Sequence, residues 1–115
     1  DKVYELISAV AGFTSELDIF WAVAAGKSPL ELMKKYGKAL SAVHIKEMDK
    51  RTKTEAREYP NAIVGEGKSD CENAIKLAKQ MGINLFILEV EGFPCEVSEY
   101  LKKSCDKMKE FAAKY

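Results

Sequence analysis

Three residues that can bind metals and transfer protons stand near the ends of three apolar stretches. Asp18 lies in "ELDIFW", His44 in "VHIKE" and Glu89 in "ILEVEG". Carboxylate oxygens together with one imidazole nitrogen suit a hard or borderline divalent ion such as Mn²⁺, Mg²⁺, Co²⁺ or Zn²⁺. Each residue alone has an ordinary alternative, because a carboxylate often ends a strand in solvent and a lone histidine is often a hydrogen-bonded core residue.

These side chains can meet only if the three stretches are neighbouring strands, and the sequence pattern predicts strands there. Apolar, β-branched and aromatic residues predict strands over 13–21, 39–48 and 83–92. Helical periodicity and end signals predict helices over 1–11, 28–37, 70–82 and 95–115, with a helical turn at 22–26. The alternation predicts an α/β fold in which parallel strands are joined by right-handed crossovers.

Periodicity also assigns the faces of these elements. Alternation along the strands groups Glu16, Asp18 and Phe20, then Ala42, His44, Lys46 and Met48, and then Leu85, Ile87, Glu89 and Glu91. Helical spacing places Val3, Leu6, Ile7 and Val10 on one face of the first helix and Leu30, Met33 and Tyr36 inward on the helix over 28–37. In the last helix the predicted stripe is Val97, Leu101, Cys105, Met108 and Phe111 or Ala112. Because the carboxyl ends of the strands form the active edge of parallel α/β folds, we expect Asp18, His44 and Glu89 to converge there.

Length and composition restrict the possible functions. The chain has 115 residues, of which 47% are hydrophobic and 31% charged, and this predicts a single folded domain over residues 1–115. Lys plus Arg and Asp plus Glu are equal at 18 each, so the composition indicates neither a nucleic-acid partner nor a membrane surface. Three cysteines without a metal-type spacing, and the absence of a long apolar run, predict reduced thiols and a cytoplasmic location. Since the chain begins at Asp1 and not at Met, we expect a processed start or a piece of a longer protein.

The segments "ELDIFWAVAAGKSPLELMKKYGKALSAVHIKEMD", "VGEG" and "FILEVEG" resemble, in their order and spacing, the sugar phosphate isomerase/epimerase family. That family has the xylose isomerase-like TIM barrel and is related to endonuclease IV. The resemblance runs from about residue 13 to the C-terminus. It implies parallel βα units equivalent to the last three strands of a TIM barrel, which form a partial barrel.

The resemblance also implies a set of functional residues. In the family a divalent ion, often Mn²⁺, is held by a Glu, an Asp, a His and another Glu from the last four strands. By motif, Asp18, His44 and Glu89 correspond to the last three of these metal ligands. Glu89 would also be the general base that transfers a proton next to the carbonyl of a sugar or sugar phosphate. The residues implied to contact the substrate are Trp21, Lys46, Glu66 and Glu91, and Lys46 would in addition be catalytic by neutralising the charge that develops.

Each implied substrate contact has a structural alternative. Trp21 can be core packing, Lys46 can be a charge at a solvated rim, and the "GEG" around Glu66 can be a tight turn before a helix. The family often has Asp where this chain has Glu47 and Glu91.

The chain is short for the fold that it resembles. A TIM barrel typically has about 250 residues, and the family's first Glu ligand comes from a preceding strand that this chain lacks. One interpretation is therefore the metal-binding part of an isomerase or epimerase. A second is an inactive half-barrel that associates with itself or with a missing N-terminal half through its open strand edges and through an inward face expected to be open at Leu85, Ile87, Ala42 and Phe20. A third interpretation is that the chain belongs to the DNA-repair branch of the superfamily. The single histidine and the balanced charge argue against it.

The connection over 49–69 is expected to be a lid or a disordered loop.

Overall fold

The computed structural model describes residues 2–10, 12–53 and 60–115 of the chain. Their elements, in chain order, are α1 (Lys2–Ser8), β1 (Ser15–Asp18), α2 (Ile19–Ala24), α3 (Pro29–Tyr36), the short 3₁₀ helix η1 (Gly37–Ala39), β2 (Leu40–Ile45), α4 (Cys71–Gln80), β3 (Leu85–Leu88) and α5 (Val97–Lys114). The predicted alternation of helices and strands is confirmed. The helical turn predicted at 22–26 overlaps α2, which begins earlier than predicted, and η1 is an additional element before β2. Within the described ranges, no helix combines the length and the apolar character needed to cross a membrane.

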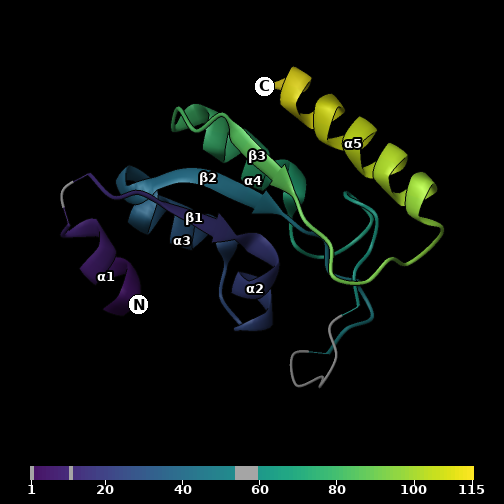
Figure 1. Cartoon of the computed structure of the whole chain (residues 1–115), viewed down its shortest axis with the longest axis horizontal. Helices are drawn as coiled ribbons and strands as arrows, with labels where there is room; N and C mark the ends of the chain where they lie inside the picture. Colours follow the sequence, from purple (N-terminus) through teal and green to yellow (C-terminus); the bar gives the residue numbers. More distant parts are fainter. Residues whose placement is uncertain (1, 11, 54–59) are drawn as a thin grey trace.

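The three strands form one parallel sheet in the order β1-β2-β3, as Figure 1 shows. Asp18 of β1 is opposite His44 of β2, and His44 is opposite Ile87 of β3. Glu89 follows two residues after Ile87, and its backbone N–H donates to the carbonyl of Ile45 at 3.2 Å, which continues the ladder beyond β3. The sheet therefore brings the carboxyl ends of all three strands to one edge, as the alternation predicts.

One face of the sheet packs on α3, α4 and the end of α5. The core residues from these elements include Leu17, Val43, Ile45, Met33, Tyr36, Ile75, Ala78 and Phe111. In Figure 1, α3 and α4 lie behind the sheet and α5 lies beside α4. Full burial of a large apolar side chain contributes roughly 1.5–3 kcal/mol, so this face supplies most of the stabilisation that holds the three strands together.

The first strand is shorter than predicted because a helix begins at its end. Asp18 is the N-cap of α2, and its Oδ1 accepts a hydrogen bond from the backbone N–H of Trp21 at 3.1 Å. An aspartate at this position satisfies a helix N–H that has no partner within the helix. Phe20 and Trp21 are therefore helical, and the prediction that the strand continues to residue 21 is wrong.

The buried face of α5 differs from the predicted stripe in the first half of the helix. Val97 and Leu101 are 45% and 43% exposed, whereas Tyr100 and Ser104 are completely buried. The Oγ of Ser104 accepts a hydrogen bond from the backbone N–H of Val64 at 3.4 Å. This polar contact holds a serine inward where the apolar pattern predicts the surface, so the predicted stripe is wrong for Val97 and Leu101.

The connection that follows β2 is held by a buried carboxylate. Glu47 is 1% exposed, and its oxygens accept hydrogen bonds from the backbone N–H groups of Ser69 at 2.7 Å and Gly65 at 3.0 Å. A Cβ on Gly67 would lie 2.1 Å from the carbonyl oxygen of Met48, which leaves no room for a side chain. Residues 60–69 are therefore ordered against the end of β2. The predicted lid or disordered loop also covers residues 54–59, which lie outside the described residues.

The opposite face of the sheet, which carries the ligand-type side chains, is covered less. Leu85 is 55% exposed, and the apolar face predicted for the first helix is exposed at Val3 (67%) and Leu6 (69%). The same open face is also expected at Ala42 and Phe20, and there the expectation is wrong, because these residues are only 3% and 0% exposed.

Candidate metal centre

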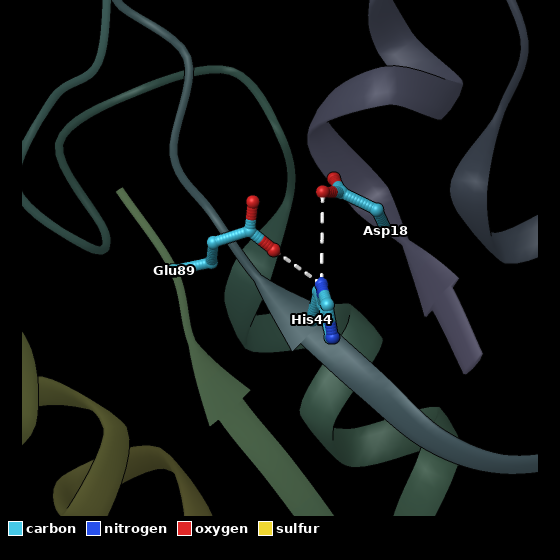
Figure 2. Close-up of side chains that lie close together, drawn as sticks. All are labelled: Asp18, His44 and Glu89. Atoms are coloured by element: carbon cyan, nitrogen blue, oxygen red, sulfur yellow. Dashed lines mark ion pairs between the residues drawn. The ribbon is translucent and has the colours of Figure 1, made fainter. Parts of the chain in front are cut away.

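Asp18, His44 and Glu89 point toward one another at the carboxyl edge of the sheet, as Figure 2 shows. One possible ligand atom from each lies within 4.8 Å of the others. His44 Nδ1 lies 3.8 Å from Asp18 Oδ2 and is in ion-pair contact with Glu89 Oε2. The side chains are 17% to 32% exposed, so the group is shielded but reachable from solvent. The expected convergence is observed, while metal binding by the three residues stays a prediction.

The two carboxylate oxygens of Asp18 have different roles, one in the fold and one in the candidate metal centre. Oδ1 caps α2 by accepting the N–H of Trp21, and Oδ2 faces His44. Burial raises the pKa of Asp18 above its ordinary value, although the N–H of Trp21 and the ammonium of Lys46 act in the opposite direction. A carboxylate whose charge is poorly solvated is stabilised by a nearby cation. Asp18 is thus positioned by α2 and electrostatically suited to a metal ion.

Lys46 is completely buried beside these three side chains. Its Nζ lies 3.0 Å from Glu91 Oε2 and 3.5 Å from Glu89 Oε1. The ammonium also lies 4.8 Å and 5.2 Å from the ring centroids of Phe20 and Trp21, and Trp21 keeps 45% of its surface exposed. Two carboxylates and two aromatic faces offset the cost of removing an ammonium from water. The solvated-rim alternative for Lys46 is wrong, and substrate contact by Lys46 stays a prediction.

An open pocket of about 590 Å³ adjoins the group on the side of Glu91. Its lining also includes Asp49, Arg51 and Asn61. The guanidinium of Arg51 donates to both oxygens of Asp49, at 3.0 Å and 2.7 Å, and these hydrogen bonds lower the pKa of Asp49 to about 2. Glu91 lines the pocket and pairs with Lys46, which also contacts the candidate ligand Glu89. The pocket therefore lies directly beside the candidate metal ligands.

Glu66 does not line this pocket. It lines a neighbouring pocket of about 230 Å³ that shares Asp49, Asn61 and Pro94 with the first, and its side chain is exposed. Its backbone N–H closes a turn onto the carbonyl of Ile63 at 2.9 Å, in agreement with the tight-turn alternative. Among the described residues, the candidate metal group does not include Glu66. The structure does not bring Glu66 to the three ligands, and its contact with a substrate stays a prediction.

The donor set fits a divalent cation. Two carboxylates and one imidazole are an oxygen-rich set that suits Mn²⁺ and also Mg²⁺, Co²⁺ or Zn²⁺. Two ligand atoms bonded to one ion at about 2.2 Å can lie up to about 4.4 Å apart. The observed separations of up to 4.8 Å therefore require only small side-chain movements. Three protein ligands also leave coordination positions open, as catalytic sites do.

Two features of this centre are not apparent from the motifs. Glu16 Oε2 lies 3.0 Å from His44 Nε2, and Asp18 is a helix cap as well as a possible ligand. The signal available for Glu16 is its place two residues before Asp18, on the same strand face. The signal for the cap is an aspartate immediately before the apolar "IFWAVA", which is a common helix start.

The three parallel strands that alternate with helices match part of the xylose isomerase-like TIM barrels seen in solved structures. The chain is similar to a sugar phosphate isomerase/epimerase from Parabacteroides distasonis, with 27% identity and a TM-score of 0.64 over 82% of this chain and 29% of that chain. A second sugar phosphate isomerase/epimerase structure from the same organism has 20% identity and a TM-score of 0.64, over 97% of this chain and 38% of that chain. A xylose isomerase domain protein from Planctomyces limnophilus has 15% identity and a TM-score of 0.76, over 97% of this chain and 41% of that chain.

Sequence identity and coverage limit what these matches show about the chain. The two structures below 25% identity show the fold alone. The chain spans 29% to 41% of the length of the three solved chains and therefore corresponds to part of their barrels. Comparisons with protein-family models and with curated proteins find no match.

Proposed function

We propose that the chain supplies the metal-binding part of a divalent-metal-dependent isomerase or epimerase that acts on a sugar or sugar phosphate. The observation that carries the proposal is the convergence of Asp18, His44 and Glu89 from three successive strand ends, with ligand atoms within 4.8 Å. The similarity at 27% identity to a sugar phosphate isomerase/epimerase supports the substrate class. The proposed reaction is proton transfer at the carbon next to a carbonyl.

Asp18, His44 and Glu89 would hold the ion, with Mn²⁺ as the first choice and Mg²⁺, Co²⁺ or Zn²⁺ as alternatives. A bound divalent ion supplies Lewis-acid polarisation of a substrate carbonyl and its neighbouring hydroxyl, which lowers the cost of the negative charge that develops there. The proposed site belongs to a cytoplasmic protein, as the three free thiols Cys71, Cys95 and Cys105 suggest.

Glu89 and Lys46 are the proposed catalytic residues, Glu89 as the general base and Lys46 as the group that neutralises the developing charge. Glu89 Oε2 contacts His44, while Oε1 lies 3.5 Å from Lys46 Nζ. Oε1 is therefore the oxygen that we assign to take up the substrate proton. The buried ammonium of Lys46 stabilises negative charge near Glu89, and the rings of Phe20 and Trp21 keep water from that ammonium.

The substrate would lie between Trp21 and the pocket beside Glu91. The ring of Trp21 is 45% exposed, which allows stacking on the apolar face of a sugar. The side chain of Glu91 is 57% exposed and can accept a substrate hydroxyl while it pairs with Lys46. The pocket beyond Glu91 offers Asp49, the bidentate partner of Arg51, and thus several hydrogen-bonding groups for the remainder of a polar substrate.

A second candidate is an interaction role, in which the partial barrel associates with a second copy or with the remaining strands of a barrel. Leu85 is 55% exposed on the sheet face that carries the ligands, and the exposed side chain of Val3 lines one pocket together with it. An open apolar sheet face is stabilised by being covered. Light scattering over a range of protein concentrations tests self-association, and a monomer at every concentration contradicts it.

Calorimetric titration of Mn²⁺ into the full chain tests the metal centre. The site variant is His44→Ala, and the matched control is Glu31→Gln, which changes an exposed carboxylate on α3. We expect one Mn²⁺ per chain for the wild type and the control, and no binding by His44→Ala, because that change removes the only imidazole of the sequence. Absence of binding by the wild type, or equal binding by His44→Ala, contradicts the proposed centre.

Deuterium wash-in tests the reaction. The chain is incubated with Mn²⁺ in D₂O with a panel of aldoses, ketoses and their phosphates, and NMR follows the carbon next to the carbonyl. We expect incorporation with the wild type and none with Glu89→Gln, because the amide cannot act as a base. Mn²⁺ binding without any incorporation would keep the metal centre, contradict this reaction for the chain, and favour the interaction role.

A further inference from the structure

The proposed function gives no role to Glu16, a charged side chain that contacts the candidate metal ligand His44. It lies on β1 two residues before Asp18 and shares the strand face of Asp18. Its Oε2 lies 3.0 Å from His44 Nε2. The other ring nitrogen, Nδ1, is the one that faces Asp18 and Glu89. In Figure 2 one nitrogen of the His44 ring is directed at these two carboxylates and the second nitrogen points away from them.

This geometry makes Glu16 a partner of the histidine and not a fourth ligand. The described group with mutually close ligand atoms contains Asp18, His44 and Glu89, without Glu16. One imidazole cannot present both of its nitrogens to the same ion. A neutral imidazole has one nitrogen with a proton and one with a free lone pair, and the partner of the N–H decides which is which.

We infer that Glu16 accepts the Nε2 proton of His44 and so holds the ring with Nδ1 aimed at the metal position, where a bound ion would take the place of the contact between Nδ1 and Glu89, an inference that rests on the proposed metal centre. A carboxylate behind a metal-binding histidine fixes the tautomer and the orientation of the ring and makes the ligating nitrogen more basic. Glu16 is therefore a positioning residue, which acts on the ion only through His44. Its side chain is 55% exposed, so its replacement removes little buried surface.

Titration of Mn²⁺ into Glu16→Ala, Glu16→Gln and the Glu31→Gln control measures the effect on affinity. We expect about 10–100-fold weaker binding for Glu16→Ala, the range typical of such outer partners. Glu16→Gln keeps an oxygen that can accept the Nε2 proton and is expected to recover part of the loss. Equal affinities for Glu16→Ala and the control overturn the inference. Equal losses for the alanine and glutamine variants overturn it as well, because they assign the effect to charge alone.

Nitrogen-15 NMR of the ring supplies a readout that a general structural change would not move. His44 is the only histidine, so its ring signals are unambiguous. We expect, in the Zn²⁺-bound wild type, an Nε2–H signal with the downfield proton shift and the slow solvent exchange of a donor to a carboxylate, and loss of both in Zn²⁺-bound Glu16→Ala. An Nε2–H signal with the same shift and the same exchange rate in both Zn²⁺-bound proteins overturns the inference.

The two measurements also separate this inference from the proposed function. If the wild type binds neither Mn²⁺ nor Zn²⁺, the proposed metal centre fails, and the inference about Glu16, which rests on it, fails with it. If the wild type binds Mn²⁺ and Glu16→Ala binds it equally well, the metal centre stands and the role of Glu16 fails.

Discussion

Glu47→Gln is expected to loosen the loop that follows β2 and to lower the stability of the whole chain. The carboxylate is 1% exposed and accepts the backbone N–H groups of Ser69 at 2.7 Å and Gly65 at 3.0 Å. Burial, together with the charge of Glu47, raises the pKa of the Cys71 thiol. A glutamine has only one acceptor oxygen, so its NH₂ group faces a donor that then has no partner.

The expected loss follows from these contacts. A hydrogen bond to a charged group contributes about 1.5–3 kcal/mol, and a buried donor left without a partner costs about 1–3 kcal/mol. Because the glutamine keeps one of the two backbone contacts in a weaker, neutral form, we expect the free energy of unfolding to fall by about 2–4 kcal/mol. The total for a domain is about 5–15 kcal/mol. With a urea dependence of about 1–3 kcal/mol per molar, the midpoint of unfolding falls by roughly 1–2 M.

Urea denaturation followed by circular dichroism measures the loss, and hydrogen exchange at the amides of Gly65 and Ser69 reports on the loop. The Glu31→Gln control changes an exposed carboxylate and is expected within about 0.5 kcal/mol of the wild type. An unchanged urea midpoint for Glu47→Gln, with both amides still protected from exchange, would refute the role assigned to the buried carboxylate.

Asp49 is expected to titrate near pH 2, because the hydrogen bonds from Arg51 lower its pKa to about 2. Since the folded-state pKa is depressed, this contact stabilises the chain above about pH 4 and the stabilisation is lost as the pH falls through 2. Carbon-13 NMR of the carboxyl group measures the midpoint, which Arg51→Ala should return toward 3.8; a wild-type midpoint already near 3.8 speaks against the contact. Asp18→Asn keeps an oxygen for the N-cap, so it should be more stable than Asp18→Ala by about 1 kcal/mol, whereas both variants should bind Mn²⁺ more weakly than the wild type. Urea unfolding and calorimetry measure the two effects, and equal stabilities would argue against the cap.

The convergence of Asp18, His44 and Glu89 is predictable from the sequence for a simple geometric reason. Side chains on a strand alternate with a period of two, and parallel strands place their carboxyl ends at one edge of the sheet. The observed register, with Asp18 opposite His44 and Glu89 two residues beyond Ile87, agrees with both rules.

The boundary of β1 shows where such pattern reasoning fails. The segment "IFW" is apolar and aromatic, which favours a strand. In the structure Asp18 accepts the N–H of Trp21 and starts α2, so capping outweighs strand propensity. The first half of α5 fails for a related reason, because the hydrogen bond from Val64 to Ser104 turns a polar residue inward.

The sequence by itself determined the order of helices and strands, the faces of the strands, and which carboxylates and imidazole meet at their ends. These properties depend on local periodicity and on end signals that neighbouring residues carry. Only the tertiary structure decided the surroundings of Lys46 and Glu47, which are adjacent in the sequence and completely or almost completely buried. Lys46 contacts Glu89, 43 residues away, and Glu47 accepts hydrogen bonds from donors 18 and 22 residues away. The physical reason is that burial and ion pairing depend on which distant segments lie alongside a residue, and no local pattern contains that information.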